Sequence, residues 1–193
     1  AEEQDRLELS LHLIENLAKR KDLKDWSGLG LAIQAYGKRA PVVVKFIDEL
    51  GANRNGMMMR LVKGAYWDQE IKIHQIKGAA DLPVFTSKSF TDLNYLSTAK
   101  IISETKNLRP YFATHNAHTI AGIMQLYQGR EDQFEFQRIF GMGDLTYRNA
   151  QKVYSDFPLT RVYAPVGSKK ELLPYLVRRL LENGANSSFV NKY

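Results

Sequence analysis

Two adjacent arginines, Arg178 and Arg179, lie in the segment YLVRRLLENG (residues 175–184), which otherwise has the pattern of an apolar helix. Paired guanidinium groups match a carboxylate or a phosphate, because each presents a planar fork of donors and stays charged at any working pH. At 100° per residue, the arc opposite the apolar face comprises Tyr175, Arg178, Arg179 and Glu182. This pattern favours an anion site. The alternative is a solvent-exposed face with intrahelical pairs to Glu182, each worth about 0.2–0.5 kcal/mol.

The segment MMMRLVKGAYW (residues 57–67) places Arg60 and Lys63 within a strand pattern. Charged side chains inside a strand are costly unless they are paired or lie at the rim of a sheet. Gly64 follows and permits close approach of the backbone to a ligand. The aromatic residues Tyr66 and Trp67 come next, and they suit a flat ring system.

The segment FATHNAHT (residues 112–119) places Thr114, His115 and Asn116 where a strand passes into a helix. Backbone N–H groups at a helix start, together with the positive end of the helix dipole, bind anions such as a pyrophosphate. A metal site built on His115 and His118 is a weaker interpretation, because no second acidic or histidine cluster lies nearby in the sequence.

A third segment, RVYAPVGSKKELL (residues 161–173), ends a strand pattern at Tyr163 and turns into the arginine helix. Ser168 and Glu171 have the spacing of a capping box, in which each side chain satisfies a backbone N–H of the other residue. Tyr163 is therefore either a core tyrosine or part of the same site as the arginines.

Five apolar, β-branched or aromatic stretches position these groups: residues 29–36, 57–65, 110–116, 134–142 and 161–167. Each is followed by a helical pattern, which predicts a parallel sheet with crossover helices. The second and third stretches are separated by a longer segment that leaves room for an additional excursion between residues 68 and 108.

Parallel strands and helices form either an open doubly wound sheet or a closed barrel. GLGLA lacks the third glycine of a dinucleotide-binding turn, which argues against the open sheet. Polar residues at the carboxyl ends of the strands favour a (β/α)8 barrel, whose sites form at that end. They are Gln34, Arg60, Lys63, Thr114, His115, Asn116, Gln137 and Tyr163. A barrel needs eight strands, and this chain provides five.

The composition is that of a globular protein: 193 residues, 44% hydrophobic and 25% charged. The absence of cysteine excludes disulfides, thiolate metal sites and cysteine nucleophiles. The net charge of +6 is scattered and matches no nucleic-acid motif, so we expect no nucleic-acid contact. No apolar run reaches the roughly 18 residues of a membrane span. The expected location is cytoplasmic, with peripheral membrane association as an alternative.

Five blocks in this order resemble the proline dehydrogenase family, specifically the C-terminal part of the flavin barrel of bacterial bifunctional proline-utilisation flavoenzymes. The blocks are RLVKGAYWDQEIK, FATHNAHT, FEFQRIFGMG, RVYAPVGS and YLVRRLLENGANSSFVN. The resemblance implies a distorted (β/α)8 barrel that holds FAD and oxidises L-proline to Δ1-pyrroline-5-carboxylate. It also implies that electrons pass to a membrane quinone, and that an aldehyde dehydrogenase domain flanks this part of the parent protein.

The resemblance also implies roles for individual residues. Arg178 and Arg179 would bind the proline carboxylate, and Glu182 would orient them or touch the flavin chain. The proline ring would be enclosed by Tyr66, Ile139, Tyr163 and Tyr175. Arg60 would lie beside the flavin N5. The remaining cofactor contacts would come from Gln34, Val62, Lys63, Gly64, Trp67, Thr86, Lys88, Thr114, His115, Asn116 and Gln137.

In this family a lysine and an aspartate of the substrate site come from strands that precede those found here. Residues 1–193 are therefore expected to form strands four to eight and helices three to eight, the C-terminal five-eighths of the barrel. We expect this chain alone to be inactive, with inward faces around Leu31, Met59, Phe112 and Phe136 lacking partners. A phosphate-binding barrel of another chemistry is the remaining alternative.

Overall fold

The computed structural model describes residues 3–186, apart from the side chains of Arg178 and of residues 180–186. It divides into two compact units, the first ending at Val162 and the second beginning at Tyr163. The strands are β1 (Gly30–Gln34), β2 (Met57–Val62), β3 (Leu108–Ala113), β4 (Glu135–Ile139) and β5 (Thr160–Tyr163). The α-helices are α1 (Leu7–Ala18), α2 (Ala40–Ala52), α3 (Trp67–Ile76), α4 (Lys88–Ser103), α5 (Ala117–Leu126), α6 (Asp144–Val153) and α7 (Lys169–Asn186). Short 3₁₀ helices comprise Gln4–Arg6, Lys21–Leu23 and Glu131–Gln133.

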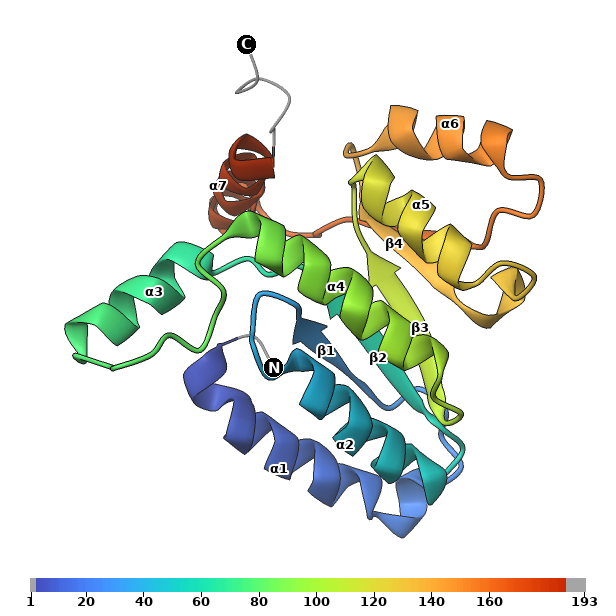
Figure 1. The fold of residues 1–193 in the computed structure, drawn as a ribbon, viewed down its shortest axis with the longest axis horizontal. Coiled ribbons are helices and arrows are strands. Elements are labelled where there is room, and N and C mark those ends of the chain that lie inside the picture. The colour runs from blue at the N-terminus through green and yellow to red at the C-terminus, as the bar shows by residue number, and fades with distance from the viewer. Residues whose placement is uncertain (1–2, 187–193) are drawn as a thin grey trace. The chain divides into compact units, whose positions relative to one another are not determined.

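The five strands form one sheet in the order β1-β2-β3-β4-β5, and the pairs from β1 to β4 are parallel (Figure 1). The predicted α/β fold with a five-stranded parallel sheet is therefore confirmed, and each predicted strand overlaps an observed one. The predicted excursion between residues 68 and 108 contains α3 and α4. Because a parallel strand must be reached by a crossover, α2, α4 and α5 each return the chain to the same end of the sheet.

One face of the sheet, which we call the core face, is covered by helices. Met57, Met59 and Leu61 alternate along β2 and are fully buried, while the residues between them are partly exposed. Because successive side chains of a strand point to opposite faces, the register carries this face to Ile33 on β1 and Phe112 on β3. Helices α2 and α4 pack against it (Figure 1).

The expectation that Leu31, Met59, Phe112 and Phe136 face a barrel interior and lack partners is wrong. Leu31 pairs with Met59 in register, and Phe112 pairs with Phe136, so all four lie on the core face. Met59, Phe112 and Phe136 are fully buried, and Leu31 packs against the same core. The error was in the phase of the alternation, because a shift of one residue exchanges the two faces of a strand.

The opposite face, which we call the polar face, carries the other set of side chains. Arg60 is level with Ala32 on β1 and with Tyr111 on β3, and Tyr111 is level with Glu135 on β4. Val62 is level with Gln34, and Ala113 with Gln137. The side chains of Gln34, Arg60 and Gln137 thus avoid the apolar core, because they lie on the second face.

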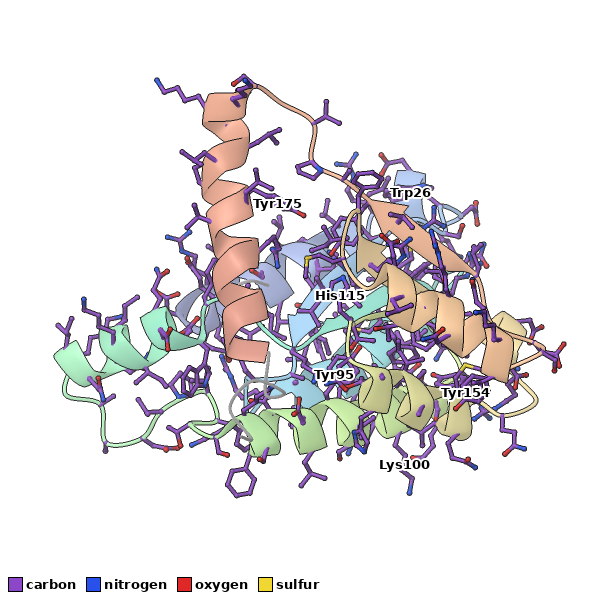
Figure 2. The ribbon with its side chains drawn as sticks, turned by 90° about the horizontal axis from the view of Figure 1, so that it is seen from above. Trp26, Tyr95, Lys100, His115, Tyr154 and Tyr175 are labelled. Carbon is purple, nitrogen blue, oxygen red and sulfur yellow. The ribbon has the colours of Figure 1, made fainter. Side chains whose placement is uncertain are left out.

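Tyr95 of α4 fixes the strands to the helix layer at their carboxyl ends. Its side chain is fully buried, and its hydroxyl lies 3.2 Å from the carbonyl oxygen of Leu61 and 3.3 Å from that of Ala113. Figure 2 shows Tyr95 inside the molecule, whereas Lys100 of the same helix points away. One hydroxyl therefore serves the ends of both β2 and β3, and burial raises the pKa of Tyr95.

Replacing Tyr95 by Phe should lower the free energy of unfolding by about 1–2 kcal/mol, because the two carbonyls lose a buried donor. Tyr127→Phe is the matched control. Tyr127 is equally buried, yet within residues 3–186 its hydroxyl has no hydrogen-bond partner. Its removal should change the free energy of unfolding by less than about 0.5 kcal/mol. Urea unfolding midpoints at constant m-value measure both. Equal losses in the two variants would contradict the assigned role of Tyr95.

Candidate functional site

The polar face of the sheet brings together four of the residues that the resemblance assigns to the cofactor: Gln34, Arg60, Val62 and Gln137. They come from β1, β2 and β4, and the strand register gives all of them the same side of the sheet. These four residues lie on one side of the sheet and toward the carboxyl ends of their strands. The sites of (β/α)8 barrels are built at this end of the sheet.

Two further charged residues of the polar face escaped the sequence analysis. Glu135 of β4 is almost fully buried and accepts two hydrogen bonds from the Arg161 guanidinium, at 2.8 and 3.0 Å. The Gln137 amide donates to the same carboxylate at 3.1 Å. Burial and the nearby Glu135 charge raise the pKa of Tyr111. A glutamate between two phenylalanines in FEF was the available signal, because an acidic residue in a buried strand requires a partner.

The loop after β2 is held to the end of β1 by backbone and side-chain hydrogen bonds. The Tyr36 N–H donates to the carbonyl of Lys63 at 2.8 Å, and the Ala65 N–H donates to Oε1 of Gln34 at 3.1 Å. The Lys63 ammonium pairs with Asp92 of α4. The Trp67 indole N–H donates to the carbonyl of Phe85 at 2.5 Å. The predicted ligands Lys63 and Trp67 thus already have protein partners.

Gly64 has a structural reason to be glycine. Its φ is +135°, and a Cβ there would lie 2.6 Å from the Tyr36 ring. The sequence analysis had assigned this glycine to close approach of a ligand, which stays a prediction; the structure shows that the Tyr36 ring fills the space that a Cβ would need. Tyr36 is fully buried beside Glu70. Burial raises the pKa of Tyr36, and the negative charge of Glu70 raises it further. The Glu70 side chain also accepts the Gln4 N–H at 2.8 Å.

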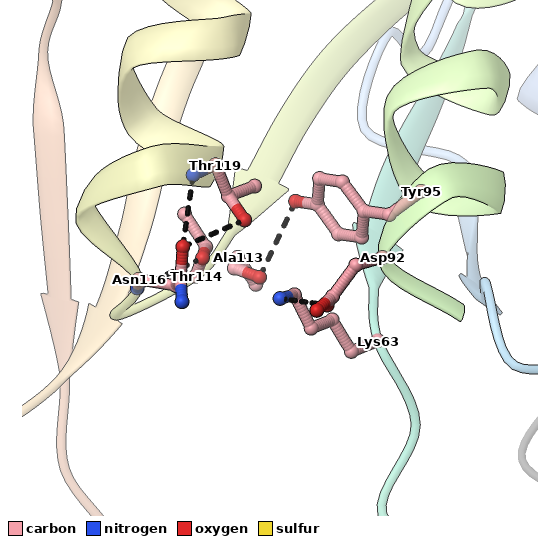
Figure 3. Close-up of polar contacts among 7 residues, drawn as sticks. All are labelled: Lys63, Asp92, Tyr95, Ala113, Thr114, Asn116 and Thr119. Carbon is pink, nitrogen blue, oxygen red and sulfur yellow. Dashed lines mark hydrogen bonds and ion pairs between the residues drawn. The ribbon is translucent and has the colours of Figure 1, made fainter. Parts of the chain in front are cut away.

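At the end of β3, the predicted anion-binding turn is organised by its own side chains. Asn116 is the N-cap of α5, and its Oδ1 accepts the Thr119 N–H at 2.9 Å (Figure 3). The Asn116 N–H donates to Oγ1 of Thr114 at 3.1 Å, and the Tyr147 hydroxyl donates to the carbonyl of Thr114 at 2.8 Å. The cap therefore uses the Thr119 N–H, one of the backbone groups at the helix start that the sequence analysis had predicted to bind an anion.

His115 is oriented by β4. Its Nε2 accepts the N–H of Ile139 at 3.1 Å, which requires a ring that is unprotonated at Nε2. His118 is exposed on α5. Among residues 3–186, no three His, Asp or Glu side chains gather closely enough to hold a metal ion.

Thr86 and Lys88 are brought to the end of β1 by the segment that precedes α4. Val84 forms an antiparallel bridge with Gly37, and the Phe85 N–H donates to the carbonyl of Tyr36 at 2.8 Å. Ser87 is the N-cap position of α4, and Lys88 is its first residue.

Of the described helices, none is long and apolar enough to cross a membrane.

The second unit contains five of the predicted substrate residues, Tyr163, Tyr175, Arg178, Arg179 and Glu182, whereas Tyr66 at the N-cap of α3 and Ile139 of β4 belong to the first unit. The predicted capping box of α7 is confirmed: the Ser168 N–H donates to Glu171 at 2.8 Å, and the Glu171 N–H donates to the Ser168 hydroxyl at 3.4 Å. The first of these bonds lowers the pKa of Glu171. On the same helix the Arg179 guanidinium lies 5.2 Å from the ring centre of Tyr175, and Figure 2 labels Tyr175 on α7. The side chains of Arg178 and Glu182 lie outside the described part of the chain.

Comparison with known proteins identifies relatives of this arrangement. A family model described as proline dehydrogenase matches residues 1–192. The Escherichia coli (strain K12) Bifunctional protein PutA is 50% identical over 202 residues, covering 100% of this chain and 15% of that protein. The Rhizobium meliloti Bifunctional protein PutA is 51% identical over 198 residues, covering 100% of this chain and 16% of that protein. A crystal structure of a Bradyrhizobium japonicum Proline Utilization A (PutA) mutant has a TM-score of 0.91 at 52% identity, covering 98% of this chain and 20% of that one.

The parallel sheet and the polar groups at its carboxyl ends define part of a TIM-like barrel. The chain belongs to the proline dehydrogenase family. It spans 15% and 16% of the length of the two curated relatives.

Replacing Gly64 by Ala should lower the free energy of unfolding by about 3 kcal/mol, from backbone strain and from the collision with Tyr36. Gly78→Ala is the matched control, because Gly78 has a φ of +64° but no atom within 4 Å of the added Cβ. It should cost only the left-handed backbone strain, about 1–2 kcal/mol. Thermal and urea unfolding compare the two, and a Gly64→Ala variant no less stable than Gly78→Ala would contradict the packing role of Tyr36.

Proposed function

We propose that this chain supplies FAD and substrate contacts for the oxidation of L-proline to Δ1-pyrroline-5-carboxylate, as part of a larger proline catabolic enzyme. The observation that carries the proposal is the strand register, which gives Gln34, Arg60, Val62 and Gln137 one common face. Membership of the proline dehydrogenase family supports the reaction class, and the name Bifunctional protein PutA of the relatives supports a larger parent protein.

The residues of the polar face fit a flavin by their chemistry. Arg60 supplies a permanent positive charge, Gln34 and Gln137 supply amide groups, and Val62 supplies an apolar surface between them. FAD, when bound, would accept a hydride from the carbon next to the proline nitrogen. Arg60 would stabilise the negative charge that then arrives on the ring system. Thr86, Lys88, Thr114 and His115 would hold the rest of the cofactor from the strand ends.

The substrate contacts proposed here come mainly from the second unit. Arg178 and Arg179 would clamp the proline carboxylate, and Glu182 would orient them. Tyr66, Ile139, Tyr163 and Tyr175 would enclose the ring and exclude water. The stacking of Arg179 on Tyr175 supports this assignment, because it restricts the rotamers of a long side chain before any ligand binds.

The reduced cofactor would pass its electrons to a quinone. A quinone in a membrane requires peripheral contact with the cytoplasmic side of the inner membrane, and the net charge of +6 supports attraction to anionic lipids. We further propose a flanking aldehyde dehydrogenase domain that consumes the imine product after its hydrolysis.

The deciding experiment uses the full-length protein that contains this chain. Purified protein should show flavin absorbance and reduce a dye when L-proline is added, with turnover on the order of 1 per second or faster. The 193-residue chain assayed alone with added FAD should do neither. Its five described strands form an open sheet whose β1 and β5 are edges, which supports inactivity in isolation. Turnover by the isolated chain would overturn that part, and a flavin-free full-length protein would overturn the function itself.

Replacing Arg178 or Arg179 by Met in the full-length protein should raise the KM for proline strongly while FAD content stays near that of the parent. Loss of a charged hydrogen bond in a buried site costs about 2–5 kcal/mol, which corresponds to roughly 30-fold to several thousand-fold in affinity. Steady-state kinetics and flavin absorbance measure the two quantities. Lys169→Met, on the first turn of the same helix, is the control. Unchanged proline affinity in both arginine variants would exclude their role.

A further inference from the structure

The first two turns of α4 bind the carboxyl ends of three successive strands. The Asn94 amide donates to the carbonyl of Ala35 at 2.7 Å, beyond the last residue of β1. The Tyr95 hydroxyl serves the ends of β2 and β3, and Asp92 pairs with the Lys63 ammonium just after β2 (Figure 3). A single helix start therefore determines how these strand ends are arranged.

The Lys63–Asp92 pair is more sheltered than the Lys38–Asp81 pair. The side-chain exposures are 17% for Lys63 and 36% for Asp92, compared with 37% and 81% for Lys38 and Asp81. A partly buried ammonium requires a close anion, because removing it from water is costly and a neighbouring carboxylate recovers much of that cost. Asp92 was not among the site residues identified from the sequence.

The location of this pair links it to the site. Lys63 follows Arg60 and Val62 of the polar face and precedes the Gly64–Trp67 loop. Figure 3 shows its ammonium beside Asp92, between the end of β2 and the turn that contains Thr114 and Asn116.

We propose that Asp92 is a positioning residue that holds the Lys63 ammonium at the rim of the cofactor site and compensates its charge there. This inference rests on the proposed function. If Asp92 compensates the Lys63 charge, its removal should change the stability of anionic forms of the flavin, in addition to any effect on folding. A positive charge near an isoalloxazine ring favours anionic forms of that ring, and a negative charge disfavours them. With Asp92 in place the two charges offset each other.

Sulfite binding measures this balance without turnover. Sulfite adds reversibly to an oxidised flavin through its sulfur lone pair and leaves one negative charge on the ring system, so its affinity reports the local charge. The test uses full-length FAD-containing protein with five variants: Asp92→Asn, Asp92→Glu, Lys63→Met, the double variant of Asp92→Asn with Lys63→Met, and Asp81→Asn. The last removes the carboxylate of the exposed Lys38 pair and serves as the matched control.

Asp92→Asn should tighten sulfite binding by about tenfold, because the Lys63 charge becomes uncompensated at a separation of several ångströms. Lys63→Met should weaken it by about the same factor, and the double variant should return to within about twofold of the parent. Asp81→Asn should leave it unchanged. Asp92→Glu, which keeps the charge, should match the parent. If Asp92→Asn alone does not fold, the double variant carries the test, because it would match Lys63→Met and not the parent if the Asp92 charge had no effect on the flavin.

Each contrary result has a distinct meaning. Unchanged sulfite affinity in Asp92→Asn with FAD bound would overturn the inference and leave the proposed function standing. A double variant that behaves like Asp92→Asn alone would show that Asp92 does not act through Lys63, which also overturns it. A purely structural Asp92 would lower the unfolding temperature without moving sulfite affinity. A parent protein that binds no FAD would overturn the proposed function, and the inference with it.

Discussion

The parallel pairing of β2 with β1 and β3 is the constraint on which the rest of the structure depends. Side chains alternate between the two faces of a strand, so one register decides the surroundings of every residue in the sheet. Met57, Met59 and Leu61 belong to the core face, which leaves Arg60 and Val62 on the polar face. The hydrophobic effect that buries the first set therefore also selects which polar groups are available for chemistry.

Much of the fold was predictable from the sequence, because parallel strands and crossover helices have strong local patterns. The five strands, the α3–α4 excursion and the Ser168–Glu171 capping box depend on residues near one another in the chain. The phase of the sheet was not predicted correctly, because β2 reads MMMRLV and has methionine at both even and odd positions. Only the packing of α2 and α4 determines which methionines are buried.

The candidate site was predictable where a residue type was unusual for its element, as with Arg60 in a strand. The site was not predictable where a residue's role depends on contact with a partner that is distant in the chain. Lys63 and Asp92 are separated by 29 residues, and Gly64 requires glycine because of the Tyr36 ring. The hydrogen bonds of Thr114 with Tyr147 and of His115 with Ile139 likewise join residues that no local pattern connects.

The carboxyl end of β2 shows why the core and the site meet where they do. Continuing the alternation past Leu61 would send the side chain of residue 63 toward the helix layer, where an unpaired lysine would be too costly to bury. Asp92, at the start of α4, makes that position tolerable, and Tyr95 one turn further in closes the apolar layer behind it. The strand then turns at Gly64, which only a residue without a Cβ can occupy against Tyr36. Leu61, the last fully buried residue of β2, and Lys63 are thus only two positions apart, because the start of α4 both covers the apolar core and supplies the carboxylate that allows a lysine at its rim.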